Sequence, residues 1–390
     1  MALFRKKDGN AAAEALPGRG DTGDGAARGS GSQLILAHSP EIPALLHDLD
    51  ITLAITTYQA GKLIFVSATD DGSLVQLPRS FDRAMALATH GERLLLSTRE
   101  TVEIYASEPR LAADYPRQPS TYDTIFLPRL SYNTGPIGCH GIAWGGDRYW
   151  IVNTRYSCLA SLSPEASFAF EWKPPFISQI VFEDRCHLNG MAMDGPRPRF
   201  VTTLGTGDSR LQWKETLPRG GTVIDVASGE IVAAELPIPH SPRMVEGNLL
   251  LLFSGTGELA ALDPATGHYE VIQRLNRFVR GMVYHGGYLF VAANKIRPDS
   301  SSFGKLDIAE VSDQAGVFVI ELESGRLAGA LVYQEGVEEI FDLEVLPGLR
   351  RPGILPAGED SDEQKRPVVW GEGAAWVDPV ASRSINSRSK

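Results

Sequence analysis

Three histidines stand just before short apolar segments that have the pattern of β-strands. They are His140, His187 and His240. A titratable ring at the entrance to a buried strand needs partners for its nitrogens once water is excluded. Three neutral imidazoles with an open fourth position suit one divalent transition metal ion, namely zinc, copper or iron, in a catalytic site. The alternative is that each ring only hydrogen-bonds to nearby backbone, as buried histidines commonly do.

Two arginines occupy corresponding positions ahead of other apolar segments. Arg83 begins "RAMALATHGER" and Arg280 begins "RGMVYHGGY". The guanidinium fork suits a carboxylate or phosphate, so these residues predict a small anionic substrate and catalytic roles for both arginines. The alternative is a structural pairing with Asp82, Asp342 or Glu344.

Three further residues are candidates for the same site. Asn189 shares its aligned position with His140, and Arg155 ends the segment "NTR" after a second strand, so both are candidates for substrate binding. Tyr156 follows directly and is a candidate acid or base catalyst. An exposed aromatic ring at such a position also serves ordinary packing.

These residues head the units of a repeat. Each unit has a polar residue, a small residue, Met or Ile, then Ala or Val, a turn and a longer apolar strand. The heads recur at residues 83, 140, 187, 240 and 280, which is the period of four-stranded propeller blades with variable outer loops. Later strands of the units form hairpins with SG or TG turns, as in "GTVIDVASGEIVAAEL" and "GVFVIELESGRLAGAL".

The two ends of the repeat are incomplete. "EIFDLEVLPG" (339–348) is a head without a hairpin, and residues 51–77 hold strands without a head. Joining them completes a sixth blade and removes the exposed sheet edges. The sequence therefore predicts an all-β, six-bladed β-propeller whose N- and C-terminal strands share one blade, with seven blades as the alternative. One short helix is expected near residue 39.

The propeller fold must bring the polar residues at the heads of the repeat units together. Because the innermost strand of every blade runs beside the central channel, polar residues at its start point into the channel or its mouth. His187 and His240 lie two residues before the aligned position of His140, and side chains alternate along a strand, so all three face the same side. The three imidazoles are therefore expected near one point at the channel mouth.

Composition divides the chain into three parts. Residues 1–34 and 351–390 are rich in Gly, Ser, Asp and Arg and are expected to be disordered tails around one propeller domain over residues 35–350. The net charge of -11 opposes binding to nucleic acid or to an anionic membrane. No apolar run approaches the ~20 residues of a membrane span and the first residues lack a secretory signal, so a cytoplasmic location is expected.

Several motifs carry a family resemblance. "TYQAGKL", "EDRCHLNGMA", "PHSPRM" and "VRGMVYHGGYLFVAANKIR" resemble an uncharacterised bacterial family of conserved hypothetical proteins, a domain of unknown function with a propeller-like repeat, over about residues 35–350. The resemblance implies the fold and little chemistry. It also implies an acidic residue near His140, where this chain has "IGCHGIAW". In architecture the predicted site is similar to the peptide-amidating lyase, a six-bladed propeller with an axial three-histidine zinc.

These observations lead to two functional hypotheses. The first is a metal-dependent enzyme, of lyase or hydrolase type, that acts on a small anionic substrate at a three-histidine site. The second is a non-catalytic propeller whose rim binds a protein or a glycan.

Overall fold

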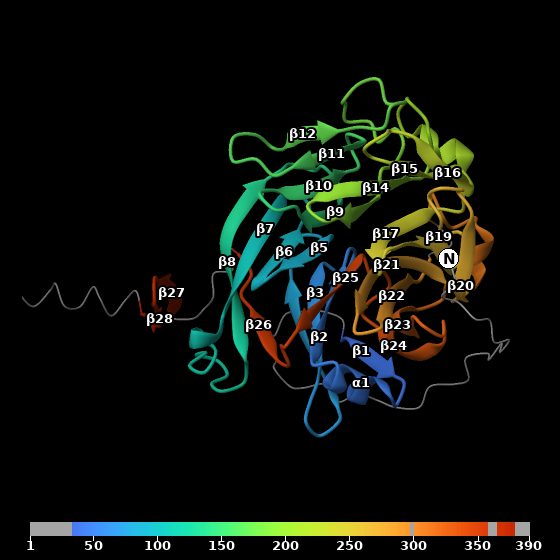
Figure 1. The fold of residues 1–390 in the computed structure, drawn as a ribbon. Helices are drawn as coiled ribbons and strands as arrows, with labels where there is room; N and C mark the ends of the chain where they lie inside the picture. The colour runs from blue at the N-terminus through green and yellow to red at the C-terminus, as the bar shows by residue number, and fades with distance from the viewer. Residues whose placement is uncertain (1–32, 297–299, 358–364, 379–390) are drawn as a thin grey trace, which may run out of the picture.

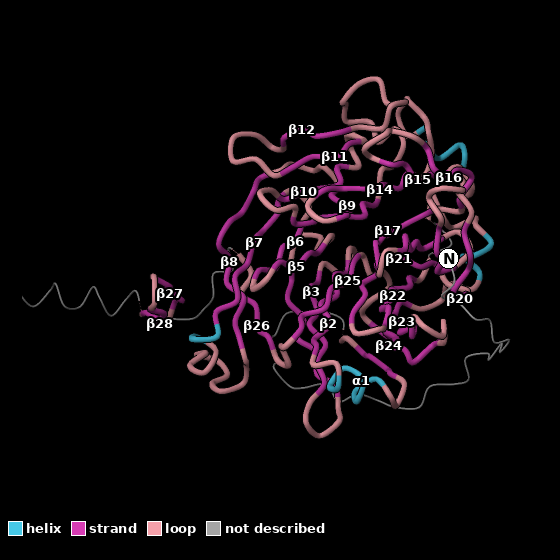
Figure 2. The backbone as a smooth tube through the Cα atoms, in the orientation of Figure 1, coloured by secondary structure: helices cyan, strands magenta, loops and turns pink. Residues whose placement is uncertain are grey.

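The computed structural model describes residues 33–296, 300–357 and 365–378, and it is an all-β protein in which strands are arranged as blades in a ring (Figures 1 and 2). Six sheets form the blades, which confirms the predicted number; each has four antiparallel blade strands, and two of the sheets carry a fifth strand at the outer edge. Among the described residues, no helix has the length and apolar character needed to cross a bilayer.

The first three blades, from the innermost strand outward, are as follows. They comprise β25 (Asp342–Pro347), β2 (Ile51–Thr57), β3 (Lys62–Ala68) and β4 (Leu74–Ser80); β5 (Leu87–His90), β6 (Arg93–Ser97), β7 (Thr101–Glu108) and β8 (Thr124–Asn133); and β9 (Cys139–Trp144), β10 (Tyr149–Asn153), β11 (Cys158–Ser161) and β12 (Ala169–Trp172).

The other three blades follow in the same order. They comprise β13 (Gly190–Asp194), β14 (Arg197–Thr203), β15 (Gly221–Asp225) and β16 (Ile231–Leu236); β17 (Pro239–Val245), β18 (Asn248–Phe253), β19 (Glu258–Leu262) and β20 (Tyr269–Arg274); and β21 (Phe278–His285), β22 (Tyr288–Asn294), β23 (Ala315–Glu321) and β24 (Leu327–Glu335).

The ring closes as the sequence predicts. β25 pairs antiparallel with β2 in an unbroken register from Ile51 opposite Pro347 to Thr56 opposite Asp342. The innermost strands contact one another in sequence around the ring, and β21 contacts β25, which in turn contacts β5. Because β25 comes from the far end of the chain, the first and last parts of the propeller hold each other in place.

The hydrophobic core is a set of layers between neighbouring blades. Leu95 and Ile104 of the second blade pack with Ile151 of the third, and Leu159 of the third packs with Val201 of the fourth. These strands are apolar on both faces because each blade is covered on both sides. Rigid blades built in this way fix the positions of the side chains at the heads of the inner strands.

Elements outside the blades are few among the described residues. β1 (Ile35–His38) pairs with β24, and α1 (Ile42–Asp48), which confirms the helix expected near residue 39, packs against β2 and β3. Single 3-10 turns are formed by Pro109–Leu111, Gln212–Thr216 and Asp307–Glu310. Residues 1–32 of the predicted N-terminal tail lie outside the described residues.

The C-terminal prediction needs correction. β26 (Pro352–Ile354) pairs in parallel with β8, and β27 (Arg366–Trp370) pairs with β28 (Gly373–Val377), so residues 351–390 are not disordered throughout. Trp376 of this hairpin packs against Tyr115 with ring centres 5.5 Å apart and donates a hydrogen bond to the carbonyl of Leu111. Two short apolar runs on either side of a Gly-Glu-Gly turn favour a hairpin despite the polar composition around them.

Truncation tests the closure of the ring. A chain ending at residue 338 lacks β25, leaves the paired edge of β2 open, and should not fold into a soluble monomer. A chain ending at residue 364 keeps β25 and β26 and should fold, as should a chain that lacks residues 1–30. Size-exclusion chromatography and far-UV circular dichroism report the result, and cooperative unfolding of the chain ending at 338 would contradict this account.

Candidate functional site

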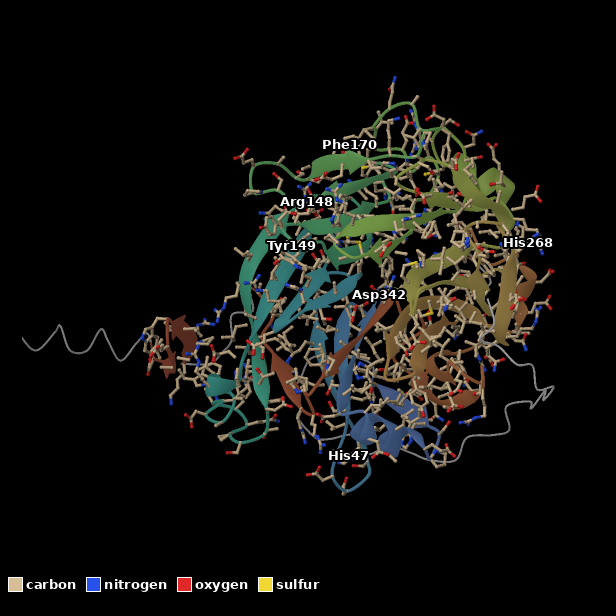
Figure 3. The ribbon with its side chains drawn as sticks, in the orientation of Figure 1. His47, Arg148, Tyr149, Phe170, His268 and Asp342 are labelled. Atoms are coloured by element: carbon tan, nitrogen blue, oxygen red, sulfur yellow. The ribbon has the colours of Figure 1, made fainter. Side chains whose placement is uncertain are left out.

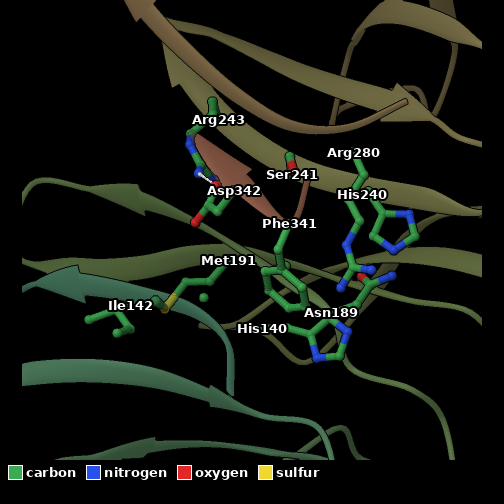
Figure 4. A pocket seen from close by; sticks show the side chains of 12 residues that line it. His140, Ile142, Asn189, Met191, His240, Ser241, Arg243, Arg280, Phe341 and Asp342 are labelled. Carbon is green, nitrogen blue, oxygen red and sulfur yellow. Dashed lines mark ion pairs between the residues drawn. The ribbon is translucent and has the colours of Figure 1, made fainter. Parts of the chain in front are cut away.

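The candidate site lies at the mouth of the central channel, where the inner strands begin. His140 lies in β9, His240 in β17 and Arg280 in β21, whereas His187 lies in the loop before β13. The ring centres of His140 and His187 are 5.0 Å apart. Figure 4 shows the guanidinium of Arg280 among His140, His240 and Asn189.

A hydroxyl from the neighbouring strand determines the tautomer of His140. Its Nδ1 lies 2.7 Å from the Thr154 hydroxyl and 3.0 Å from the carbonyl of Gly138. The Thr154 hydroxyl donates its own hydrogen to the carbonyl of Leu188, which belongs to the next blade. Because that proton is already used, Nδ1 must carry the hydrogen, and Nε2 of the neutral ring holds a lone pair.

His240 repeats this arrangement. Its Nδ1 lies 2.8 Å from the Ser254 hydroxyl, and Ser254 donates to the carbonyl of Val279 in the next blade. The ring therefore has the hydrogen on Nδ1 and a lone pair on Nε2. Both His240 and Ser254 are buried.

His187 uses a carboxylate instead of a hydroxyl. Its Nδ1 lies 3.0 Å and 3.1 Å from the two carboxylate oxygens of Asp184, which is buried. Both residues have left-handed backbone, with φ of 49° at Asp184 and 51° at His187, which turns the two side chains toward each other. Trp213 packs against the imidazole with ring centres 4.3 Å apart.

All three imidazoles thus share one property. Each Nδ1 is bound to a fixed protein acceptor, and no Nε2 of the three has a hydrogen bond to another described residue. A carboxylate, carbonyl or hydroxyl on the other ring nitrogen is the usual outer partner of a metal-binding histidine, where it fixes orientation and tautomer. The chemistry of the donor set therefore fits a transition metal ion.

Burial and charge keep two of the rings neutral. Burial lowers the pKa of His140 and His240 well below the ordinary value of 6.5, and the nearby Arg280 cation lowers it further. Arg280 itself lies 3.9 Å over the ring of Phe341 and 3.4 Å from a carboxylate oxygen of Glu339. Neutral rings keep their Nε2 lone pairs at physiological pH.

The spacing of the rings matches a shared ion only for one pair. Two imidazoles on one tetrahedral ion have centres roughly 5 Å apart, given metal–nitrogen bonds of about 2.0–2.1 Å. The 5.0 Å between His140 and His187 agrees with this arrangement. Across the described residues, however, no three His, Cys, Asp or Glu side chains stand close enough to hold one ion.

The cavity at this point is small. It has a volume of about 30 Å³ and is lined by residues of five blades, including His140, Asn189, His240, Arg280 and Phe341. This space is comparable to the volume of one water molecule. An ion or a water fits there, whereas the body of a substrate must lie outside, toward the mouth.

The other predicted residues have different positions. Asn189 is buried, donates to the carbonyl of Pro239 and accepts from Thr202, so its amide joins two blades. Arg155 lies 3.9 Å from Asp184, close to the histidines.

Tyr156 packs with Phe168 and Phe182, with ring centres 5.1 Å and 5.6 Å apart. Arg83 is exposed and donates to the hydroxyl of Tyr58.

The alternative pairings of the arginines differ from those expected. Asp82 pairs with Arg99, not with Arg83, and Arg280 pairs with Glu339. The acidic residue that the resemblance implies beside His140 is replaced by the Gly138 carbonyl and the Thr154 hydroxyl. The carboxylate of this site, Asp184, stands beside His187 instead, in the segment "EDRCH".

The interior of the channel holds a second polar group. Asp342 lies near the centre of the ring (Figure 3), and Glu344 follows two residues later on the same face of β25. An oxygen of Asp342 is 3.9 Å from the Arg243 guanidinium, and Thr89 donates to Glu344. Burial, and secondly the charge of Asp342, raise the pKa of Glu344 to about 8.

The overall geometry defines the class of protein as a six-bladed β-propeller with a polar cluster at its channel mouth. The family model described as "Domain of unknown function (DUF4915)" matches residues 40–355, and the chain belongs to this family. The expected family resemblance is thereby confirmed. No curated protein matches the chain.

Two solved structures are similar to this chain. A chain of a nidogen/laminin complex has a TM-score of 0.50 at 11% identity, with 76% of this chain and 99% of that chain covered. A catalytically inactive virginiamycin B lyase from Staphylococcus aureus, solved with quinupristin, has a TM-score of 0.37 at 11% identity, with 77% and 99% covered. The first likeness supports the propeller fold alone.

Removal of one hydroxyl tests the link between blades. Ser254→Ala leaves the Val279 carbonyl and His240 Nδ1 without their partner in a buried place, so the free energy of unfolding should fall by about 1–3 kcal/mol. Ser228→Ala, in an exposed turn, is the control and should change stability by less than about 0.5 kcal/mol. Urea denaturation measures both, and equal stability of the two variants would contradict the role of Ser254.

The raised pKa of Glu344 predicts a pH dependence of stability. Between pH 4.5, the ordinary value, and about 8, the folded state keeps a proton that the unfolded state has lost, so wild-type stability falls as pH rises through this window. Glu344→Gln removes this fall and should melt a few degrees above wild type at pH 9. At pH 4.5 the difference should be small. Parallel melting curves for the two proteins from pH 4.5 to 9 would refute the shift.

Proposed function

We propose that the channel mouth is a catalytic site of lyase or hydrolase type, in which His140, His187 and His240 bind one divalent transition metal ion. Arg280 binds the anionic group of a small substrate. The observation that carries the proposal is that all three Nδ1 atoms are bound to protein acceptors and all three Nε2 atoms are left for a ligand.

The chain's own residues have separate roles in this proposal. The hydroxyls of Thr154 and Ser254 and the carboxylate of Asp184 orient the rings, and a carboxylate partner also makes an imidazole more basic. A bound ion would supply Lewis acidity or lower the pKa of a bound water. His140 and His187 would hold the ion at their present spacing of 5.0 Å, and His240 would join them only if the channel mouth contracted.

Arg280 is suited to hold the substrate. Its side chain is 14% exposed, its one carboxylate contact is 3.4 Å long, and the face of Phe341 covers one side of the guanidinium. A guanidinium has five N–H donors, so donors remain for a carboxylate or phosphate at the mouth. The small cavity limits the water that can reach the reacting atoms.

The second candidate is a non-catalytic scaffold that binds a protein or a glycan at its rim. The observation in its favour is that Phe170, on the outermost strand β12, and Phe182, in the loop between β12 and β13, are 50% and 51% exposed. Aromatic side chains of this kind are enriched where proteins bind partners.

Metal content separates the two candidates. Protein prepared without an affinity tag and incubated with zinc should retain about one equivalent per chain, and His187→Ala should retain only a small part of it. His268→Ala, at the outer edge of the ring (Figure 3), is the matched control and should bind as wild type does. Elemental analysis by mass spectrometry provides the measurement.

Two results would contradict the metal proposal. One is the absence of retained zinc, copper and iron in the wild type. The other is unchanged metal content in His187→Ala together with a sharp fall in melting temperature, which would show that the histidines are structural. Either result favours the scaffold.

A further inference from the structure

A second cavity lies at the closing blade, which is the blade of β25 and β2–β4. Its residue Tyr58 stacks on Phe341, which lines the first cavity. The volume of the second cavity is about 560 Å³, it opens to solvent, and its lining comprises Tyr58, Gln59, Gly61, Phe81, Asp82, Arg83 and Arg99. Sites for small molecules are commonly of this size. It can hold the part of a substrate that the smaller cavity cannot.

The charges in this cavity leave one cation uncompensated. Arg99 donates to both oxygens of Asp82, at 3.0 Å and 2.9 Å, so these two charges cancel. Arg83 donates to the neutral hydroxyl of Tyr58 at 3.0 Å, and no carboxylate of a described residue lies within ion-pair distance of it. The cavity is therefore positive in a chain whose net charge is -11.

The backbone holds Arg83 in place. Its φ is 60°, a left-handed conformation that residues other than glycine rarely adopt. On one side, the neighbouring turn is tight, because a Cβ at Gly61 would lie 2.8 Å from the carbonyl oxygen of Phe81. On the other side, the amide of Arg99 donates to the carbonyl of Asp82. Strained residues fixed by their surroundings are concentrated at functional sites.

Aromatic rings connect this cavity with the histidine site. Tyr58 lies under the Arg83 guanidinium, 5.2 Å from it, and stacks on Phe341 with ring centres 5.8 Å apart. The Arg280 guanidinium lies 3.9 Å from the centre of the Phe341 ring, and the ring centres of His140 and Phe341 are 5.3 Å apart. The two cations thus flank one pair of stacked rings.

We infer that this second cavity binds a carboxylate or phosphate group of the substrate at the end remote from Arg280, so that the substrate carries two anionic groups. Arg83 is the specificity-determining residue, and the Tyr58 and Phe341 rings line the space between the two anions. The inference rests on the proposed function, which places the reaction at the histidine site. Binding of anions can nevertheless be measured without any turnover.

Isothermal titration with simple anions tests the inference. The probes are the dicarboxylates from succinate to suberate, phosphonoacetate, and propionate as the compound with one charge. Wild type should bind the best dianion about tenfold or more tightly than propionate, since a charge-assisted hydrogen bond is gained. Tighter binding of phosphonoacetate than of succinate that is lost in Arg83→Gln identifies phosphate as the remote group, and the reverse order, also lost in Arg83→Gln, identifies carboxylate.

Variants of two exposed arginines complete the test. Arg83→Gln should abolish the preference for dianions and leave propionate binding unchanged. Arg93→Gln is the matched control, because Arg93 is also exposed and also donates to a tyrosine hydroxyl, that of Tyr149. It should keep the preference within about twofold.

The outcomes are distinct from those of the metal experiment. A preference for dianions that persists in Arg83→Gln, or that is lost equally in Arg93→Gln, overturns the inference. The same holds if wild type shows no such preference. If the preference depends on Arg83 while wild type retains no metal, the anion site stands and the proposed metal chemistry fails.

Discussion

A hydroxyl shared between blades is the interaction on which the rest of the structure depends. One hydroxyl residue lies at or next to the end of the second strand in three blades, and each donates to a carbonyl near the start of the next inner strand. These residues are Thr56, Thr154 and Ser254. With its hydrogen committed, each oxygen accepts from a group at the head of its own blade. That group is the imidazole of His140 or His240 in two blades and a backbone amide in the closing blade. The same hydroxyls therefore join the blades and orient the rings.

This coupling explains why the rings of His140 and His240 are neutral and fixed in orientation. A ring whose Nδ1–H is held by a buried hydroxyl cannot rotate without breaking that hydrogen bond, and burial beside Arg280 disfavours a second proton. Asp184 orients His187 from within the same loop. The propeller thus places lone pairs and one cation around a cavity of about 30 Å³.

Much of the fold follows from the sequence because propeller blades are local repeats. The polar heads, the hairpin turns and the incomplete fragments at 51–77 and 339–348 are each visible in a few residues, and their sum requires a closed ring. The hairpin of β27 and β28 is not predicted because two short apolar runs lie in a polar segment, and their packing on a distant apolar cluster that includes Leu111 and Tyr115 stabilises them. Composition alone predicts disorder there.

The site is less predictable from the sequence, since the groups that hydrogen-bond to the imidazoles come from other strands. The heads of the units indicate His140, His187, His240 and Arg280, but the hydroxyls that orient the rings become apparent only when strand ends are placed beside the next blade. Asp184 lies three residues before His187 and reaches its ring only because both residues have left-handed backbone. The types of these residues do not predict that conformation.

The most direct test of the central claim is the protonation of the rings, observed by long-range nitrogen–proton correlation spectroscopy with ¹⁵N-labelled histidine. His140 and His240 should be neutral at pH 7, with the hydrogen on Nδ1 and an unprotonated Nε2, and should remain so well below pH 6.5. Signals from the opposite tautomer, or from an imidazolium that titrates near pH 6.5, would contradict the account.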